Sequence, residues 1–165
     1  MRNRAQSFED LEIYKRCIEF QQSVFEETKR WPKEEMYSLI DQVRWSSRAI
    51  GECIAEAWAK RRYPAHFISK LTDADGEQNE TRHWLYTANM SGYLDKTTFE
   101  KHMEQCSVIG AQLGLMMKNA ADWRPTVRPL DSPTVQQSNR LTVKPSDSIT
   151  VQPSNSPTVR LSNKP

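Results

Sequence analysis

Residues 7–32, SFEDLEIYKRCIEFQQSVFEETKRWP, decide the fold class of this chain. Apolar side chains recur in this segment every three or four residues, which is the spacing of one face of an α-helix. Ser7 is suited to cap the helix, because its hydroxyl can accept a backbone N–H of the first turn, and Trp31-Pro32 ends it. The buried stripe that this spacing predicts consists of Leu11, Tyr14, Cys17, Ile18, Val24 and Phe25.

Three further helices are expected after the first. The second opens at Glu34 and closes at the basic run 60–62, the third runs from Pro64 to Gly92, and the fourth starts at Thr97 or Thr98. Proline is favoured at the first helical position and glycine just past the end. The three predicted apolar stripes are Leu39, Val43, Ser47, Ile50, Ile54 and Trp58; Phe67, Leu71, Ala74, Gln78, Leu85 and Ala88; and Phe99, Met103, Cys106, Ile109, Leu113 and Met117.

These helices predict an all-α protein, an antiparallel up-down-up-down four-helix bundle over residues 1–123. No segment before the C-terminal tail shows the period-two alternation of a strand, and short connections favour antiparallel neighbours. Small residues interrupt the stripes and indicate close helix crossings, either inside the bundle or between subunits. They are Ser46, Ser47, Ala49 and Gly51 on the second helix, and Gly110 and Gly114 on the fourth.

The composition changes after Trp123, which is the last aromatic residue. Seven of the nine prolines lie from Pro125 onward, and a Thr-Val pair recurs every eight residues from Thr126 to Thr158. Each repeat offers too little apolar surface to compensate for the entropy lost on ordering the chain. We therefore expect residues 124–165 to form a disordered octapeptide-repeat tail.

The charge balance excludes a protein that coats nucleic acid with its whole surface. The formal net charge is only +2, and up to residue 125 there are 18 Lys and Arg against 19 Asp and Glu. Binding to phosphates would therefore depend on local clusters. Cys17, Cys53 and Cys106 form no C-x-x-C pair and behave as small apolar residues. Since no signal peptide or membrane-spanning run is present, we expect a cytoplasmic protein with no membrane partner.

Basic residues are the candidate binding residues. In an up-down-up-down bundle the helix ends would gather Arg2, Arg4, Lys60, Arg61, Arg62, Lys118 and Arg124 at one end. Arg44 and Arg48, four residues apart on the second helix, form a second candidate patch. Such cations can bind phosphates. They can equally complement helix dipoles or form a solvated surface, and both interpretations stay open.

No combination of residues predicts a catalytic site, a metal site or a cofactor. Glu80-x-x-His83 is a single motif, whereas a di-iron bundle needs two together with further glutamates, so an ordinary surface pair is the better interpretation. No glycine-bracketed serine or phosphate-binding Gly-Lys loop is present. Trp45, Trp84 and Trp123 could stack on bases, although large aromatics on helices more often pack in a core or a subunit interface. We therefore expect a protein that is not an enzyme.

The stretch from Phe8 to Trp123 resembles the four-helix-bundle proteins encoded in intervening sequences of bacterial 23S ribosomal RNA genes. The accessory variability proteins of diversity-generating retroelements belong to the same broader group. Two positions depart from the family's pattern, with Cys53 in place of Asn and Ala57 in place of Gly. The resemblance is carried by the opening SFEDLEIYKR at 7–16, by Trp31, Pro32, Tyr37, Leu39, Gln42, Val43 and Arg44, by CIAEA at 53–57, and by Glu77, Glu80, Thr81, Trp84 and Leu85.

This resemblance implies a non-enzymatic homo-oligomer, often a pentameric ring. It also implies an accessory role with RNA or with a nucleic-acid enzyme such as a reverse transcriptase. The alternative is a structural or protein-interaction bundle with no nucleic-acid role, which would use the tail or the acidic run Asp73, Asp75, Glu77 and Glu80 on the third helix.

Overall fold

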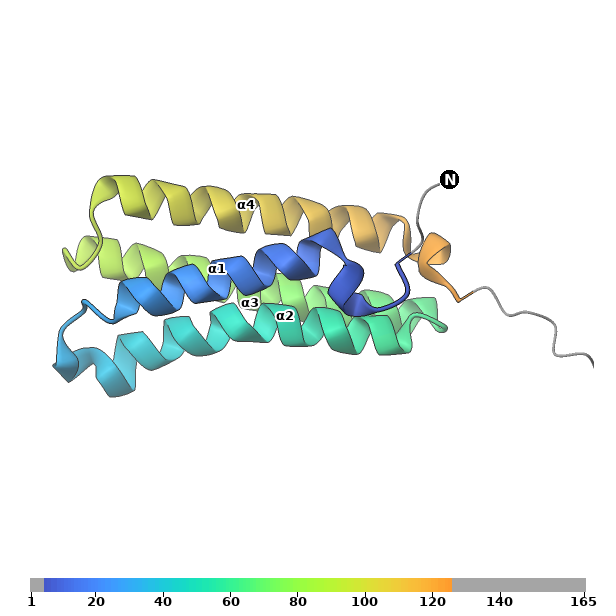
Figure 1. The fold of residues 1–165 in the computed structure, drawn as a ribbon, viewed down its shortest axis with the longest axis horizontal. Coiled ribbons are helices and arrows are strands. Elements are labelled where there is room, and N and C mark those ends of the chain that lie inside the picture. Colours follow the sequence, from blue (N-terminus) through green and yellow to red (C-terminus); the bar gives the residue numbers. More distant parts are fainter. Residues whose placement is uncertain (1–4, 126–165) are drawn as a thin grey trace, which may run out of the picture. The chain divides into compact units, whose positions relative to one another are not determined.

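A computed structural model describes residues 5–125, and all regular structure in this range is helical. Consecutive long helices run in opposite directions (Figure 1). The predicted all-α four-helix bundle is therefore confirmed, while Arg2, Arg4 and all but the first two residues of the predicted tail lie outside the described range. The elements are η1 (Phe8–Asp10), α1 (Glu12–Thr28), η2 (Lys33–Glu35), η3 (Met36–Ile40), α2 (Asp41–Lys60), α3 (Pro64–Met90), α4 (Lys96–Lys118) and η4 (Ala120–Trp123).

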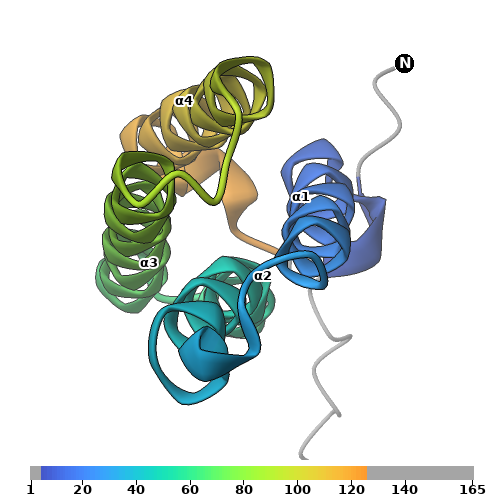
Figure 2. The ribbon, with the colours of Figure 1, turned by 90° about the vertical axis from the view of Figure 1, so that its left-hand side faces the viewer.

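The four long helices surround one apolar core. Seen along the bundle, α1 lies between α2 and α4, and α3 lies opposite α1 (Figure 2). The helix α2 packs most extensively against α3. Between residues 5 and 125, no helix combines the length and the apolarity needed to cross a membrane.

The helix ends follow local hydrogen bonding. Ser7 acts as a cap, but it caps the short turn η1 and not α1, since Leu11 is extended (φ −70°, ψ 126°) and α1 starts only at Glu12. Gly92 adopts φ +77° after α3, which confirms the predicted glycine stop. The fourth helix is capped by Asp95 and not by Thr97 or Thr98, because the Asp95 carboxylate accepts the Thr98 N–H at 3.0 Å.

The predicted stripes of α2 and α3 are buried almost throughout, with only Trp58 partly exposed. On α1 the prediction was partly wrong, because Ile13 and Phe20 are buried while Ile18 is 39% exposed and Tyr14 and Phe25 are only partly buried. On α4 the buried set contains His102 and Met116, which the sequence analysis did not predict. The predicted residues Phe99, Met103 and Met117 are only partly buried.

Small residues bring α2 and α3 close together. The Thr81 hydroxyl donates to the Ser46 hydroxyl at 2.9 Å in the buried space between the two helices. Ser46, Ser47, Ala49 and Gly51 are all buried. Gly51 faces Tyr14 and Cys17 of α1 and not α3. The crossings expected at the small residues of α2 therefore lie inside the bundle, whereas Gly114 on α4 is exposed.

The cysteines contribute to packing. All three are free thiols, and Cys17 and Cys106 have no exposed surface. Burial raises the pKa of both thiols to about 12, so the nucleophilic thiolate is not populated at neutral pH. Cys17 and Cys106 therefore act as the small apolar residues that the sequence predicts.

The segment before α2 contains a π-helical turn, η3, at Met36–Ile40. It follows η2 directly and continues into α2 without a break. Leu39 and Ile40 are buried, whereas Tyr37 is 92% exposed. This turn thus contributes two side chains to the core of the bundle and one aromatic side chain to its outer surface.

His102 is a buried titratable group between α1 and α4. Its ring is 1% exposed and packs edge-on against Phe20, with the ring centroids 5.9 Å apart. The Nδ1 atom lies 3.2 Å from Oε1 of Gln105. Burial lowers the pKa of His102, because the charged imidazolium would lose its hydration.

Acidification is expected to destabilise the bundle through His102. The unfolded chain takes up a proton at this position near pH 6.5, while the folded chain does so only at lower pH. The free energy of unfolding should therefore decrease as the pH falls from about 7 through 6 toward the lowered pKa. Urea unfolding of the wild type and of His102→Leu over this range measures the effect. The variant should show a weaker pH dependence than the wild type.

Candidate nucleic-acid interface

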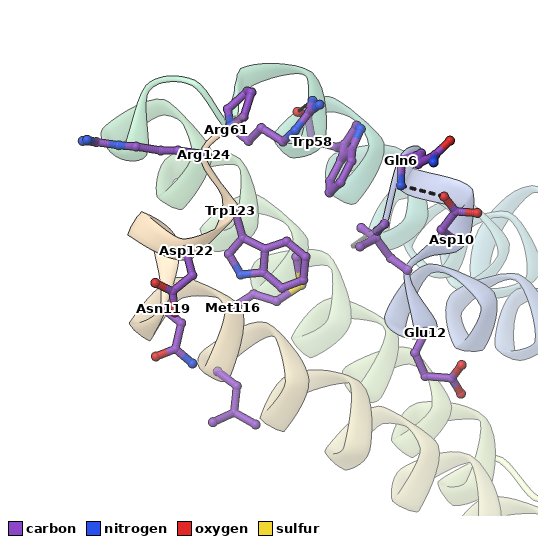
Figure 3. A pocket seen from close by; sticks show the side chains of 14 residues that line it. Gln6, Asp10, Glu12, Trp58, Arg61, Met116, Asn119, Asp122, Trp123 and Arg124 are labelled. Atoms are coloured by element: carbon purple, nitrogen blue, oxygen red, sulfur yellow. Dashed lines mark hydrogen bonds between the residues drawn. The ribbon is translucent and has the colours of Figure 1, made fainter. Parts of the chain in front are cut away.

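Two residues of the predicted basic end, Arg61 and Arg124, line one pocket of the structure. The end of α2, the start of the described chain and η4 meet around an open pocket of about 880 Å³ (Figure 3). Arg61 and Arg124 line this pocket together with the indoles of Trp58 and Trp123, whose ring centroids are 6.3 Å apart. The bundle therefore brings together residues that are far apart in the sequence.

Two of the predicted binding residues at this end already have intramolecular partners. The Arg61 guanidinium lies 4.0 Å above the Trp58 ring and donates to the Trp58 carbonyl at 2.6 Å. Lys60 lies 3.6 Å from a carboxylate oxygen of Glu56. These contacts match the helix-end interpretation, in which cations stabilise the last carbonyl groups of a helix. Arg62, Lys118 and Arg124 are exposed.

Acidic side chains share this end. Asp10, Glu12 and Asp122 line the same pocket as the arginines. The Asp10 carboxylate accepts the backbone N–H groups of Ser7 and Gln6, and these bonds lower its pKa, so it is negatively charged at neutral pH. A phosphate at this end would meet charges of both signs.

The second predicted patch forms a more uniform site on α1 and α2. Three cations surround the ring of Phe25, at 4.6 Å for Lys29 Nζ, 4.8 Å for the Arg44 guanidinium carbon and 5.8 Å for that of Arg48. Arg44 Nε also donates to the Thr28 hydroxyl at 2.7 Å. We call Phe25, Lys29, Arg44 and Arg48 the cation cluster.

The two arginines of the cation cluster form no ion pair within the described part of the chain. Lys29 pairs with Glu26 at 2.8 Å, but neither Arg44 nor Arg48 pairs with any residue between 5 and 125. Both arginines line a hollow of about 350 Å³ whose other walls are Asp41, Gln42 and Trp45. The site therefore holds two arginines that pair with no carboxylate between residues 5 and 125, although the acid Asp41 lies in the same hollow.

The three candidate tryptophans have different environments. Trp123 packs against Trp58 and Phe67, and Trp84 Nε1 donates to a Glu80 carboxylate oxygen at 3.0 Å. Trp45, in contrast, is 72% exposed. Trp45 is therefore not part of the core of the bundle, and its position in a subunit interface stays a prediction. The exposure of the Trp45 side chain could have been predicted from the sequence, because Trp45 falls between the buried positions Val43 and Ser47 of the α2 stripe.

The remaining candidates lie on α3. His83 packs against the Trp84 ring, with centroids 4.7 Å apart, and Glu80 bonds to the same indole. In residues 5–125 no three His, Cys, Asp or Glu side chains are placed to share a metal ion. Burial and the nearby carboxylates of Glu80, Asp73 and Glu52 raise the pKa of Glu77. The outer side of α2 and α3 thus carries an acidic strip of Glu52, Glu56, Asp73, Glu77 and Glu80. Lys70 offsets part of its charge by pairing with Glu56 at 2.9 Å and Asp73 at 3.1 Å, and Lys60 lies 3.6 Å from Glu56.

Comparisons with known proteins agree with this fold. Residues 9–114 match the model of a family described as 23S rRNA-intervening sequence protein. A crystal structure of a protein of unknown function from the S23 ribosomal protein family of Bacteroides thetaiotaomicron is similar, with a TM-score of 0.59 and 25% sequence identity. The similarity covers 64% of this chain and 98% of that one. A search of curated proteins found no match.

The family match covers more than half of the chain and includes α1, α2, α3 and most of α4. It also contains the cation cluster and Trp45. On this evidence, the chain belongs to the 23S rRNA-intervening sequence protein family.

Proposed function

We propose that this protein is a non-enzymatic, homo-oligomeric helical-bundle scaffold that associates with RNA in the cytoplasm. The observation that carries the proposal is the cation cluster, where Arg44 and Arg48 lie over one ring without an ion pair to residues 5–125. Like charges held this close repel each other, and a bound phosphate would relieve the repulsion. The name of the family supports RNA as the source of that phosphate.

Large apolar side chains on the outer surface support self-association. Tyr86 and Met90 on α3 are 55% and 71% exposed, and Leu115 on α4 is 59% exposed. On the family resemblance we propose that the oligomer is a pentameric ring. It also adds, in a retroelement context, a nucleic-acid enzyme such as a reverse transcriptase as a further partner.

The cation cluster is a better phosphate site than the basic end. At the basic end Arg61 and Lys60 have intramolecular partners, and Asp10, Glu12 and Asp122 line the pocket. At the cluster, the guanidinium forks retain free donors that match the geometry of phosphate oxygens. Since Arg62, Lys118 and Arg124 remain exposed, the basic end serves in this proposal as a secondary surface.

A salt series tests the proposal with the full chain. Binding of single-stranded RNA should weaken as salt rises from about 50 to 200 mM, because phosphate contacts release counterions. The double variant Arg44→Gln, Arg48→Gln should reduce the slope of log K against log salt by about 1.4, or roughly 0.7 for each lost phosphate contact. Fluorescence anisotropy of a labelled RNA measures both quantities.

A variant at the other site separates the two surfaces. Replacing Lys60, Arg61 and Arg62 by Glu should weaken binding less than the changes at Arg44 and Arg48. A larger effect at 60–62 would move the binding site to the basic end. If the wild type binds no RNA at low salt, the RNA-associated function is wrong.

The acidic strip favours a second candidate function, a bundle that binds a basic protein partner without any nucleic-acid role. The carboxylates of Asp73 and Glu80 on α3 are exposed, so a cationic side chain from a partner would find acceptors there. Under this alternative, Asp73→Asn and Glu80→Gln should weaken a pull-down of the partner, and no RNA should be recovered with the complex.

A further inference from the structure

Trp45 is the aromatic residue that the bundle leaves open beside its cation cluster. Its side chain is 72% exposed, and it takes part in no ring-to-ring contact with residues 5–125. Keeping an indole in water forgoes the stabilisation that its burial would bring. An exposed ring of this size between two arginines thus contributes little to the fold of the monomer.

The guanidinium groups of Arg44 and Arg48, beside Trp45, have hydrogen-bond donors that are not used within the described part of the chain. Arg44 uses only Nε, for the bond to Thr28. Its Nη groups and all the guanidinium nitrogens of Arg48 donate no hydrogen bond to another residue in the described part of the chain. A guanidinium presents these donors in a planar fork that suits the oxygens of a phosphate.

The Trp45 ring and the guanidinium groups of Arg44 and Arg48 border the same hollow. Arg44, Trp45 and Arg48 line one hollow of about 350 Å³, and Gln42 and Asp41 complete its walls. The Gln42 amide offers a donor and an acceptor, and the Asp41 carboxylate offers acceptors only. The hollow therefore combines a stacking surface, two phosphate-binding cations and two groups that can bond to the edge of a base.

We infer that this face of α2 binds single-stranded RNA, with one base stacked on Trp45 and the adjoining phosphate held by Arg44 and Arg48. The inference rests on the proposed function and names the form of RNA that it takes. A single strand fits because its bases are free to stack on an aromatic side chain. In a duplex the bases are stacked on each other, so their faces are not free to stack on an aromatic side chain, while the phosphates stay accessible.

Substitution at Trp45 tests this inference in the full chain. The probe is an oligouridine of about twelve nucleotides, compared with the same strand annealed to oligoadenosine, at constant low salt. Trp45→Ala should lower the affinity for the single strand by about 5- to 150-fold and leave the affinity for the duplex nearly unchanged. Trp45→Phe should restore most of the binding, because phenylalanine keeps a stacking surface.

Two matched variants complete the experiment. Tyr37→Ala removes an aromatic side chain that is 92% exposed before α2, outside the hollow, and should leave the binding unchanged. Arg48→Gln should weaken the binding of both the single strand and the duplex, since each presents phosphates. Sedimentation of every variant without RNA monitors its oligomeric state.

The outcomes separate this inference from the proposed function. Equal loss of single strand and duplex on Trp45→Ala, or no loss of either, would overturn the stacking role while RNA association stands. Absence of RNA binding by the wild type would overturn both. A change in sedimentation for Trp45→Ala, with unchanged RNA binding, would assign the ring to a contact between copies of the chain and would also overturn the inference.

Discussion

Replacement of Phe20 by alanine is expected to lower the free energy of unfolding by about 3–5 kcal/mol, the usual cost of removing a buried aromatic ring. Phe20 has no exposed surface and packs on the His102 ring between α1 and α4. A loss of this size is a large part of the total stability of an ordinary domain. Urea unfolding followed by circular dichroism measures it.

Phe25 is the matched control on the same helix. Its ring is only partly buried and lies under the cations of Lys29, Arg44 and Arg48. Phe25→Ala should therefore cost less than about 2 kcal/mol, because the ring is only partly buried and its removal loses less apolar burial. If Phe25→Ala proves more destabilising than Phe20→Ala, α1 is rotated relative to the structure described above.

Reversal of both arginines is expected to have the largest effect on RNA binding. The double variant Arg44→Glu, Arg48→Glu should lower the affinity for single-stranded RNA by at least about 100-fold at low salt. Two charge-assisted hydrogen bonds of about 1.5–3 kcal/mol each are lost, and two carboxylates now repel the phosphates. Titration of the labelled RNA against wild type and variant measures the ratio.

The effect must be separated from net charge and from folding. Lys15→Glu with Lys101→Glu makes the same change in net charge at two exposed positions on α1 and α4, and it should cost less than about 10-fold. Arg48→Glu alone breaks no side-chain hydrogen bond inside residues 5–125, so it should retain the stability of the wild type. An equal loss in the Lys15, Lys101 variant would show that binding depends on overall charge and not on this site.

The misassigned stripe on α1 has a specific physical cause. The predicted spacing was counted from Leu11, which is buried but extended, one residue before the helix begins. A helical period has no meaning across a non-helical residue. The segment also contains two apolar sets, one with Ile13, Phe20 and Val24 and another with Ile18 and Phe25, and periodicity alone cannot choose between them.

The stripes of α2 and α3 were predictable because each helix has one dominant apolar set. In α3 even Gln78 was placed correctly, since its neighbours in the stripe, Ala74 and Leu85, fix the phase. On α4, His102 was missed because histidine is seldom fully buried. Its burial depends on Phe20 from α1, a tertiary contact that local sequence does not encode.

The candidate site was predictable in its charges but not in its aromatic groups. Arg44 and Arg48 could be named because an i, i+4 pair lies on one face of a helix. The position of Phe25 under these cations depends on how α1 packs beside α2. That Arg44 and Arg48 form no ion pair with residues 5–125 is likewise a property of the assembled surface, and it could not be read from one helix.

The π-turn at Met36–Ile40 has a consequence for how the gene can change. A π-turn holds one residue more than an α-turn, so deletion of one codon within this turn would convert it to ordinary α-helix. The chain before the deletion would keep nearly the same orientation about the axis of α2, because a π-turn uses its additional residue within a single turn of the helix. The stripe from Val43 to Ile54 would keep its register. This turn is therefore the place where the bundle can gain or lose a codon without repacking the interior of α2.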